Sequence, residues 1–166
     1  MNNKSYDFKD VNFLVKSAVV AAIYAVLTLM LPMLSYGPIQ LRFSEIMVLL
    51  VFYNRRFIPG LVLGCMLANL ASPIAIFDVI FGSLASYLAF IFMVKEKNLF
   101  KSSLYMVASM VIPALLTYFL LDNSTAFIIM LLQFMASEFL VVSIIGVSIF
   151  KVLEKNKGFM AYIKNF

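Results

Sequence analysis

The sequence predicts an all-α integral membrane protein, a bundle of six transmembrane helices with both termini in the cytoplasm. Of its 166 residues, 64% are hydrophobic and 13% are charged, and the mean hydropathy is +1.02. An ordinary soluble domain has about 25% charged residues, and most residues of a small domain touch solvent. We therefore expect residues 1–166 to form a single transmembrane domain in a lipid bilayer, with a polar N-terminal tail (about 1–12) and a basic C-terminal tail (about 151–166).

Six apolar segments, separated by charged or turn-forming residues, predict the six helices. They are Phe13–Leu31, Phe43–Tyr53, Phe57–Ala71, Ile74–Val94, Ser102–Leu121 and Thr125–Phe150. A crossing helix needs about 20 apolar residues, and the second and third segments have only 11 and 15. These two segments either cross as short helices or form a re-entrant hairpin that enters from outside. Pro113 should kink the fifth segment.

The distribution of basic residues supports this topology. With six crossings and an internal N-terminus, twelve of the thirteen basic residues fall on the cytoplasmic side and only Arg42 falls outside. Such asymmetry is typical of multispanning proteins. It also argues against nucleic acid as a partner, because the basic residues lie in short runs between apolar segments rather than in one patch.

Several kinds of chemistry are excluded by missing residues. The chain has no histidine and one cysteine, Cys65, so the usual zinc sites, disulfide frameworks and histidine general bases are absent. No GxxxxGK[ST] phosphate loop is present, so the chain cannot hydrolyse ATP by that mechanism. We expect no cofactor.

Three acidic residues, Glu45, Asp78 and Glu138, lie inside apolar segments. An acid in the middle of a membrane helix costs about 2.5 to 3.5 kcal/mol on insertion scales, so it usually faces the bundle interior or a water-filled cavity. Arg42 is three residues before Glu45 and either pairs with it on one helix face or contacts a ligand. Asp78 and Glu138 have no basic neighbour in the sequence, which favours a ligand or a polar partner on another helix.

The polar residues of the expected external ends should converge on one outward-facing pocket, with Glu138 below them. They are Gln40, Arg42, Ser44, Glu45, Asn69, Ser72 and Asp78. A carboxylate can accept two parallel N–H bonds from a guanine-like edge, and an amide can match the adjacent carbonyl. The pattern therefore indicates a planar, hydrogen-bonding heterocycle as the ligand.

Small residues repeat along the first segment, at Ser17, Ala21 and Ala25, with Ala18 and Ala22 beside them. Such small-xxx-small patterns let a second helix approach closely in lipid. From the residues alone, packing within the chain is a better explanation than contact with a partner.

Four blocks in order along the chain resemble the QueT family. They are SYGPIQLRFSE (35–45), IPG (58–60), GCMLANL (64–70) and FDVIFGSLA (77–85). The final segment, with Glu138, is compatible but less distinctive. Members of this family are substrate-binding S components of energy-coupling-factor (ECF) transporters, assigned to the uptake of queuosine precursors.

The resemblance implies a transporter subunit of the bacterial cell membrane and not an enzyme. It would bind a 7-deazaguanine such as preQ0, preQ1 or queuine, and would associate with a transmembrane T subunit and two cytoplasmic ATPase subunits that supply the energy. The substrate-binding residues would be Gln40, Arg42, Glu45, Asn69, Asp78 and Glu138. In the wider class, small residues of the first helix meet the T subunit, which would make Ala18, Ala21, Ala22 and Ala25 the partner interface.

Three alternatives remain at this point. The chain is an S component for another small vitamin, an intramembrane enzyme that uses acids such as Glu45 and Asp78, or a structural subunit that binds no small molecule. The absence of histidine argues against the enzyme.

Overall fold

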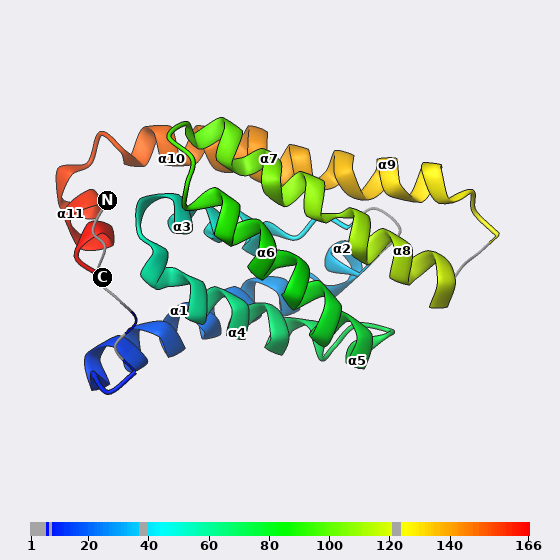
Figure 1. Cartoon of the computed structure of the whole chain (residues 1–166), viewed down its shortest axis with the longest axis horizontal. Coiled ribbons are helices and arrows are strands. Elements are labelled where there is room, and N and C mark those ends of the chain that lie inside the picture. The colour runs from blue at the N-terminus through cyan, green and yellow to red at the C-terminus, as the bar shows by residue number, and fades with distance from the viewer. Residues whose placement is uncertain (1–5, 7, 37–39, 121–123) are drawn as a thin grey trace.

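The computed structural model describes residues 6, 8–36, 40–120 and 124–166, and every regular element within these ranges is a helix (Figure 1). In chain order the elements are α1 (Val11–Leu29), α2 (Pro32–Ser35), η1 (Phe43–Leu49), α3 (Leu50–Tyr53), η2 (Arg55–Phe57), α4 (Ile58–Asn69), α5 (Ala75–Phe77), η3 (Asp78–Gly82), α6 (Ser83–Met93), α7 (Leu99–Ser109), α8 (Val111–Leu120), α9 (Phe127–Glu138), η4 (Phe139–Gly146), α10 (Val147–Leu153) and α11 (Lys157–Lys164). Of these, η1 and η2 are 3₁₀ helices, whereas η3 and η4 are π-helical stretches.

Four helical stretches are long and apolar enough to cross a membrane. They are Val11–Leu29, Ala75–Met93, Leu99–Leu120 and Phe127–Leu153. Even the shortest, with 19 residues, is about 28 Å long at 1.5 Å per residue, close to the roughly 30 Å of bilayer hydrocarbon. The stretch Phe43–Tyr53 is apolar but shorter. The structure thus confirms an all-helical protein with several helices suited to a membrane.

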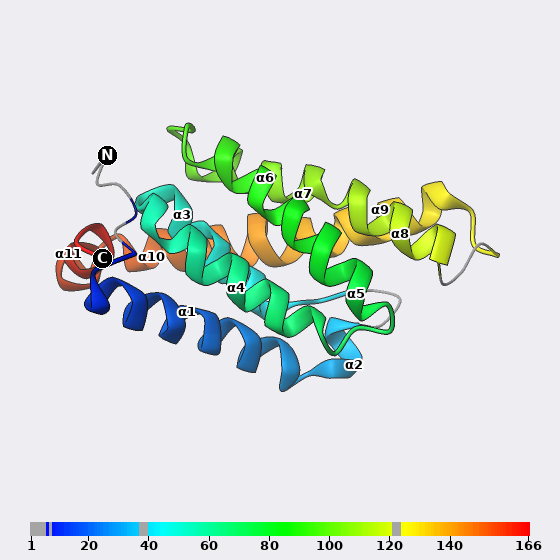
Figure 2. The same cartoon turned by 60° about the horizontal axis from the view of Figure 1, so that its bottom comes forward.

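One end of the bundle gathers both ends of the described chain and the turn between α3 and α4. Asn54 donates a hydrogen bond to the backbone oxygen of Ile163 at 3.0 Å, and Arg56 lies 4.0 Å from Asp10, the residue that caps α1. Figure 2 shows α11 beside the start of α1 at this end. The turn at Asn54 therefore reaches the end at which the first long helix begins.

The opposite end gathers the C-terminal end of α4 and the segment that follows α1. The hydroxyl of Tyr36 donates to the backbone oxygen of Ala68, and Arg42 donates to Asn69. Both η1–α3 and α4 therefore run from one end of the bundle to the other, although each is short.

Helices α1 and α4 are in close contact because two glycines of α4 face small residues of α1. A Cβ atom at Gly60 would lie 2.7 Å from the backbone oxygen of Ser17, and one at Gly64 would lie 2.8 Å from Cβ of Tyr24 and 3.0 Å from the oxygen of Ala21. Glycine spaced by four residues on one helix is a common means of close approach in lipid. Ser17 and Ala21 of α1 thus form a contact within the chain.

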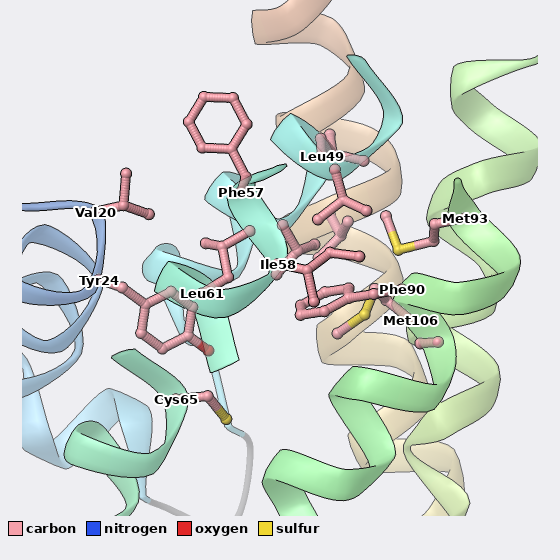
Figure 3. Packing of buried hydrophobic residues seen from close by; sticks show 14 of the residues in the cluster. Val20, Tyr24, Leu49, Phe57, Ile58, Leu61, Cys65, Phe90, Met93 and Met106 are labelled. Atoms are coloured by element: carbon pink, nitrogen blue, oxygen red, sulfur yellow. The ribbon is translucent and has the colours of Figure 1, made fainter. Parts of the chain in front are cut away.

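The apolar core lies between this pair and the helices of the C-terminal half. Tyr24, Leu61 and Cys65 lie on one side, and Phe90, Met93 and Met106 lie on the other, each at most 3% exposed (Figure 3). The lipid-facing sides are also apolar, since large hydrophobic residues such as Val15, Val19 and Ile23 are exposed. Soluble monomers rarely expose so many.

The structure agrees with the predicted segments and adds two short helices, α2 after the first segment and α11 after the last. The interruption expected from Pro113 falls at Met110, where α7 ends and α8 begins. The basic tail expected after Phe150 is instead ordered, because α10 continues to Leu153 and α11 forms a separate helix. The first residues of the expected N-terminal tail, and part of the connections after the first and fifth predicted segments (37–39 and 121–123), lie outside the described residues.

Candidate ligand-binding site

One cavity of the bundle is lined by all six residues that the sequence selected as ligand contacts. They are Gln40, Arg42, Glu45, Asn69, Asp78 and Glu138. They come from five different segments, so the fold and not the sequence order brings them together. The cavity has a volume of about 30 Å³, which is room for about two water molecules. A bicyclic base would require the cavity to widen.

Arg42 is held by two neutral acceptors. It precedes η1 with an extended backbone (φ −94°, ψ 97°), so its side chain does not project from the helix face that carries Glu45. Its Nε donates to the backbone oxygen of Ser35 at 3.1 Å, and its Nη1 donates to Oδ1 of Asn69 at 3.0 Å. The ring of Tyr36 lies under the guanidinium, 5.3 Å from its carbon. The alternative of an Arg42–Glu45 salt bridge is therefore wrong for this structure.

Glu45 is bound by a tyrosine of α1 instead. The hydroxyl of Tyr24 donates to Oε1 of Glu45 at 2.5 Å, and both residues are buried. The other carboxylate oxygen, Oε2, is buried without a hydrogen-bond partner among the described residues. A buried acceptor without a donor costs about 1 to 3 kcal/mol, so Oε2 is available for a donor that enters the cavity.

Asn69 and Asp78 connect α4 to η3. The amide nitrogen of Asn69 donates to the backbone oxygen of Asp78 at 2.9 Å, and the hydroxyl of Ser72 donates to the Asp78 carboxylate. A Cβ atom at Gly82 would lie 3.1 Å from that amide nitrogen, so the glycine leaves room for Asn69. These contacts fix both side chains at the cavity wall.

Glu138 differs from the other two acids because no described residue donates a hydrogen bond to it. It is 4% exposed, and its Oε1 is buried without a hydrogen bond. Within the described part of the chain, no side chain donates to Glu138 or forms an ion pair with it. A solitary buried carboxylate is strongly unfavourable in its charged form. Glu138 is therefore available for a proton or for a cationic donor that enters the cavity.

Two of the acids lie where an α-helix changes to a π-helix. Asp78 is the first residue of η3, and Glu138 immediately precedes η4. Short π-helical stretches inside α-helices are rare and occur frequently at functional sites.

A comparison with known protein families covers the part of the chain that forms the cavity. A family model described as "QueT transporter" matches residues 14–155, which include every lining residue of the cavity. The chain belongs to the QueT transporter family.

The chain is also similar to a curated protein. Over 86 residues the chain is 40% identical to the "Queuosine precursor transporter QueT" of Lactococcus lactis subsp. cremoris (strain MG1363). This match covers 51% of the chain and 47% of the relative, so the chain spans about half the length of the curated relative that it matches. No solved structure matches this QueT family chain.

Some lining residues of this QueT family cavity were not selected from the sequence. They are Cys65, Gly82, Ser86, Met110, Pro113, Thr117, Phe134 and Ser137. Most of them lie three or four residues from another lining residue on the same helix, and residues at that spacing share one helix face. That spacing is the signal that would have found them, although apolar and small residues at such positions are common in any helix core.

The four alanines expected at a partner interface are divided by the structure. Ala21 and Ala25 are buried, at 1% and 8% exposure, whereas Ala18 and Ala22 are exposed. Ala21 contacts Gly64 of α4. Only Ala18 and Ala22 remain available to a partner helix in this conformation.

Proposed function

We propose that this chain is the substrate-binding S component of an ECF-type transporter that imports a queuosine precursor of the 7-deazaguanine type. The observation that carries the proposal is a buried polar cavity inside an apolar bundle of the QueT transporter family. The relative in Lactococcus lactis is named as a transporter of queuosine precursors. The proposed substrate contacts are Gln40, Arg42, Glu45, Asn69, Asp78 and Glu138.

The chemistry of the lining suits a guanine-type base. Such a base presents adjacent N–H groups at one edge, with a carbonyl beside them, and Glu45 Oε2 is an unpartnered acceptor in the cavity. Arg42, which lines the same cavity, has further N–H groups beyond the two hydrogen bonds that it makes to Ser35 and Asn69. The carboxylate can accept hydrogen bonds from the N–H groups of the base, and a donor in the same cavity can bind the carbonyl of the base.

We also propose six crossings by a single transmembrane domain, with both termini in the cytoplasm of a bacterial cell. The turn at Asn54 lies at the end of the bundle that holds the start of α1 and α11, which supports two short crossings over a re-entrant hairpin. That end also holds Arg55 and Arg56, whereas Arg42 lies at the other end with Asn69. The positive-inside rule then places the end with Asn54 in the cytoplasm.

The proposed role requires partners that supply energy, because we propose a binding and translocation protein and not an enzyme. These partners are a transmembrane T subunit and two cytoplasmic ATPase subunits. The exposed side of α1 supports such a contact, since Ala18 and Ala22 lie there among apolar side chains. Small residues let an opposing helix approach closely.

Two measurements test the proposal. The chain is purified alone in detergent, and mass spectrometry identifies any small molecule that co-purifies; a 7-deazaguanine is expected. Uptake of a labelled 7-deazaguanine is then measured in cells that express the chain with or without the T and ATPase subunits. Uptake only with the complete set supports the S-component role, whereas transport by the chain alone or binding of an unrelated vitamin would overturn it.

A further inference from the structure

The cavity has more negative than positive groups. Its charged lining residues are one arginine, Arg42, and three acids, Glu45, Asp78 and Glu138. Arg42 donates to Ser35 and Asn69, which are neutral acceptors. No carboxylate of the cavity is therefore neutralised by a direct ion pair within the described residues.

The three acids differ in what already binds them. Glu45 accepts a hydrogen bond from Tyr24, and Asp78 accepts one from Ser72. Glu138 is as deeply buried as Glu45 but accepts none from the described residues. The described acids and cysteine also form no cluster that could hold a metal ion. Glu138 is thus the acid that gains most from a cation brought by the ligand.

Glu138 lines the cavity from a different helix than Glu45 and Asn69 do. It ends α9, which lies across the bundle from α1 and α4 (Figures 1 and 2). Glu45 and Asn69 line the same cavity from η1 and α4, and η1 packs against η4, the π-helical stretch that follows Glu138. In a 7-deazaguanine, the N–H edge belongs to the six-membered ring and the 7-substituent belongs to the five-membered ring. One ligand can therefore direct its base edge at Glu45 and its substituent at Glu138.

We propose, on the basis of the proposed function, that the cavity selects a 7-deazaguanine whose 7-substituent carries a protonated amine, and that the Glu138 carboxylate binds this ammonium group. A neutral substituent would leave the carboxylate unpaired in the cavity, where it is costly. An ammonium group supplies both the opposite charge and the N–H donors that Glu138 lacks. Hydrogen bonds between charged groups are the strong ones in a buried site.

Calorimetric titration of the purified wild-type protein with two probes tests the proposal. The probes are 7-aminomethyl-7-deazaguanine, which is cationic, and 7-cyano-7-deazaguanine, which is neutral. We expect the cationic probe to bind about 10- to 100-fold more tightly. Glu138→Gln should remove most of this preference by weakening the cationic probe alone, and Glu138→Asp, which keeps the charge, should retain part of it.

The matched control is Glu154→Gln. Glu154 accepts a hydrogen bond from Tyr53 at 3.0 Å on the exposed surface, away from the cavity, and its substitution should leave both affinities unchanged. Equal binding of the two probes by wild-type protein would overturn the selection of a cation and leave the proposed function standing, whether or not the variants fold. A preference that survives Glu138→Gln would overturn the role of Glu138. Failure of both probes, with stabilisation by another vitamin, would overturn the proposed function itself.

Discussion

Gly60 and Gly64 lie where α4 comes closest to α1, and alanine at either position tests how closely the two helices must pack. The added Cβ at Gly60 would stand 2.7 Å from the backbone oxygen of Ser17, about 0.7 Å short of the ordinary contact distance of 3.4 Å. At Gly64 the nearest atom is Cβ of Tyr24 at 2.8 Å. Neither neighbour is the free end of a flexible side chain, so the helices themselves would have to separate.

The expected magnitude follows from two opposing effects. Overpacking of a close contact typically costs 1 to 3 kcal/mol, whereas replacing a helical glycine by alanine contributes up to about 1 kcal/mol in helix propensity. We therefore expect Gly60→Ala and Gly64→Ala each to lower the free energy of unfolding by about 1 to 2 kcal/mol.

Thermal unfolding in detergent, followed with a thiol-reactive dye, measures this effect. Cys65 is the single cysteine of the chain and is 3% exposed, so it reacts when the bundle opens. Gly158→Ala in α11 is the control, because a Cβ there meets only Oδ1 of Asn156 at 3.4 Å. It should leave the midpoint unchanged or raise it. If Gly60→Ala were as stable as the wild type, this contact would not set the distance between α1 and α4, and our interpretation of the glycine pair would be refuted.

Two further predictions concern α1. Ala25→Leu should lower thermal stability because Ala25 is buried. Ala22 lies on the exposed side, so Ala22→Leu should keep stability and ligand binding but reduce co-purification with the T subunit. The reverse pattern would contradict the division of the alanines. Tyr24→Phe leaves Oε1 of Glu45 without its donor and should lower the free energy of unfolding by about 1 to 3 kcal/mol, and an unchanged unfolding midpoint would count against this hydrogen bond.

Hydropathy located the helical segments well because the physical signal is local. Each long helix begins and ends within about three residues of its predicted segment, since the charged and turn-forming residues that separate the apolar runs mark the helix ends. The helix α11 was missed for the same reason. It has eight residues with Lys157 and Lys164 at its ends, so no apolar run marks it. The burial of Met160 and Ile163 on one face and the hydrogen bond from Asn54 to Ile163 explain why it is ordered.

The small residues of α1 show what a pattern in one helix cannot decide. Their spacing identified a surface for close approach, but the partner of that surface depends on the rest of the chain. Gly60 and Gly64 form a matching pattern in α4, and a second small-residue surface in the same chain favours an internal contact. The small residues of both helices must be considered together before one of these surfaces is interpreted as a contact with another protein.

The composition of the cavity could be predicted in part because acids are costly in lipid. Glu45, Asp78 and Glu138 each require polar surroundings, and three such residues in one small bundle have few places to lie other than a common cavity. The spacing of Arg42 and Glu45 misled for a local reason. Arg42 caps η1 with extended backbone, so the three-residue rule for helix neighbours does not apply to it. Tyr24 could not be foreseen as the partner of Glu45, because the two are 21 residues apart.

The change from α to π geometry at Asp78 and Glu138 connects the site to the helices that hold it. A π-helical turn contains more residues than an α-helical turn, so the side chains after it are rotated relative to those before it. The helices α9–η4–α10 and α5–η3–α6 can thereby keep apolar residues such as Leu132, Ile144 and Leu84 exposed at the surface while each directs one acid into the cavity. If the same sequence formed a regular α-helix, the residues on the two sides of the acid could not both keep their positions. Either half of the apolar face would turn away from the surface, or the acid would turn away from the cavity. The irregular backbone therefore follows from placing a charged group in a helix whose outer face is apolar.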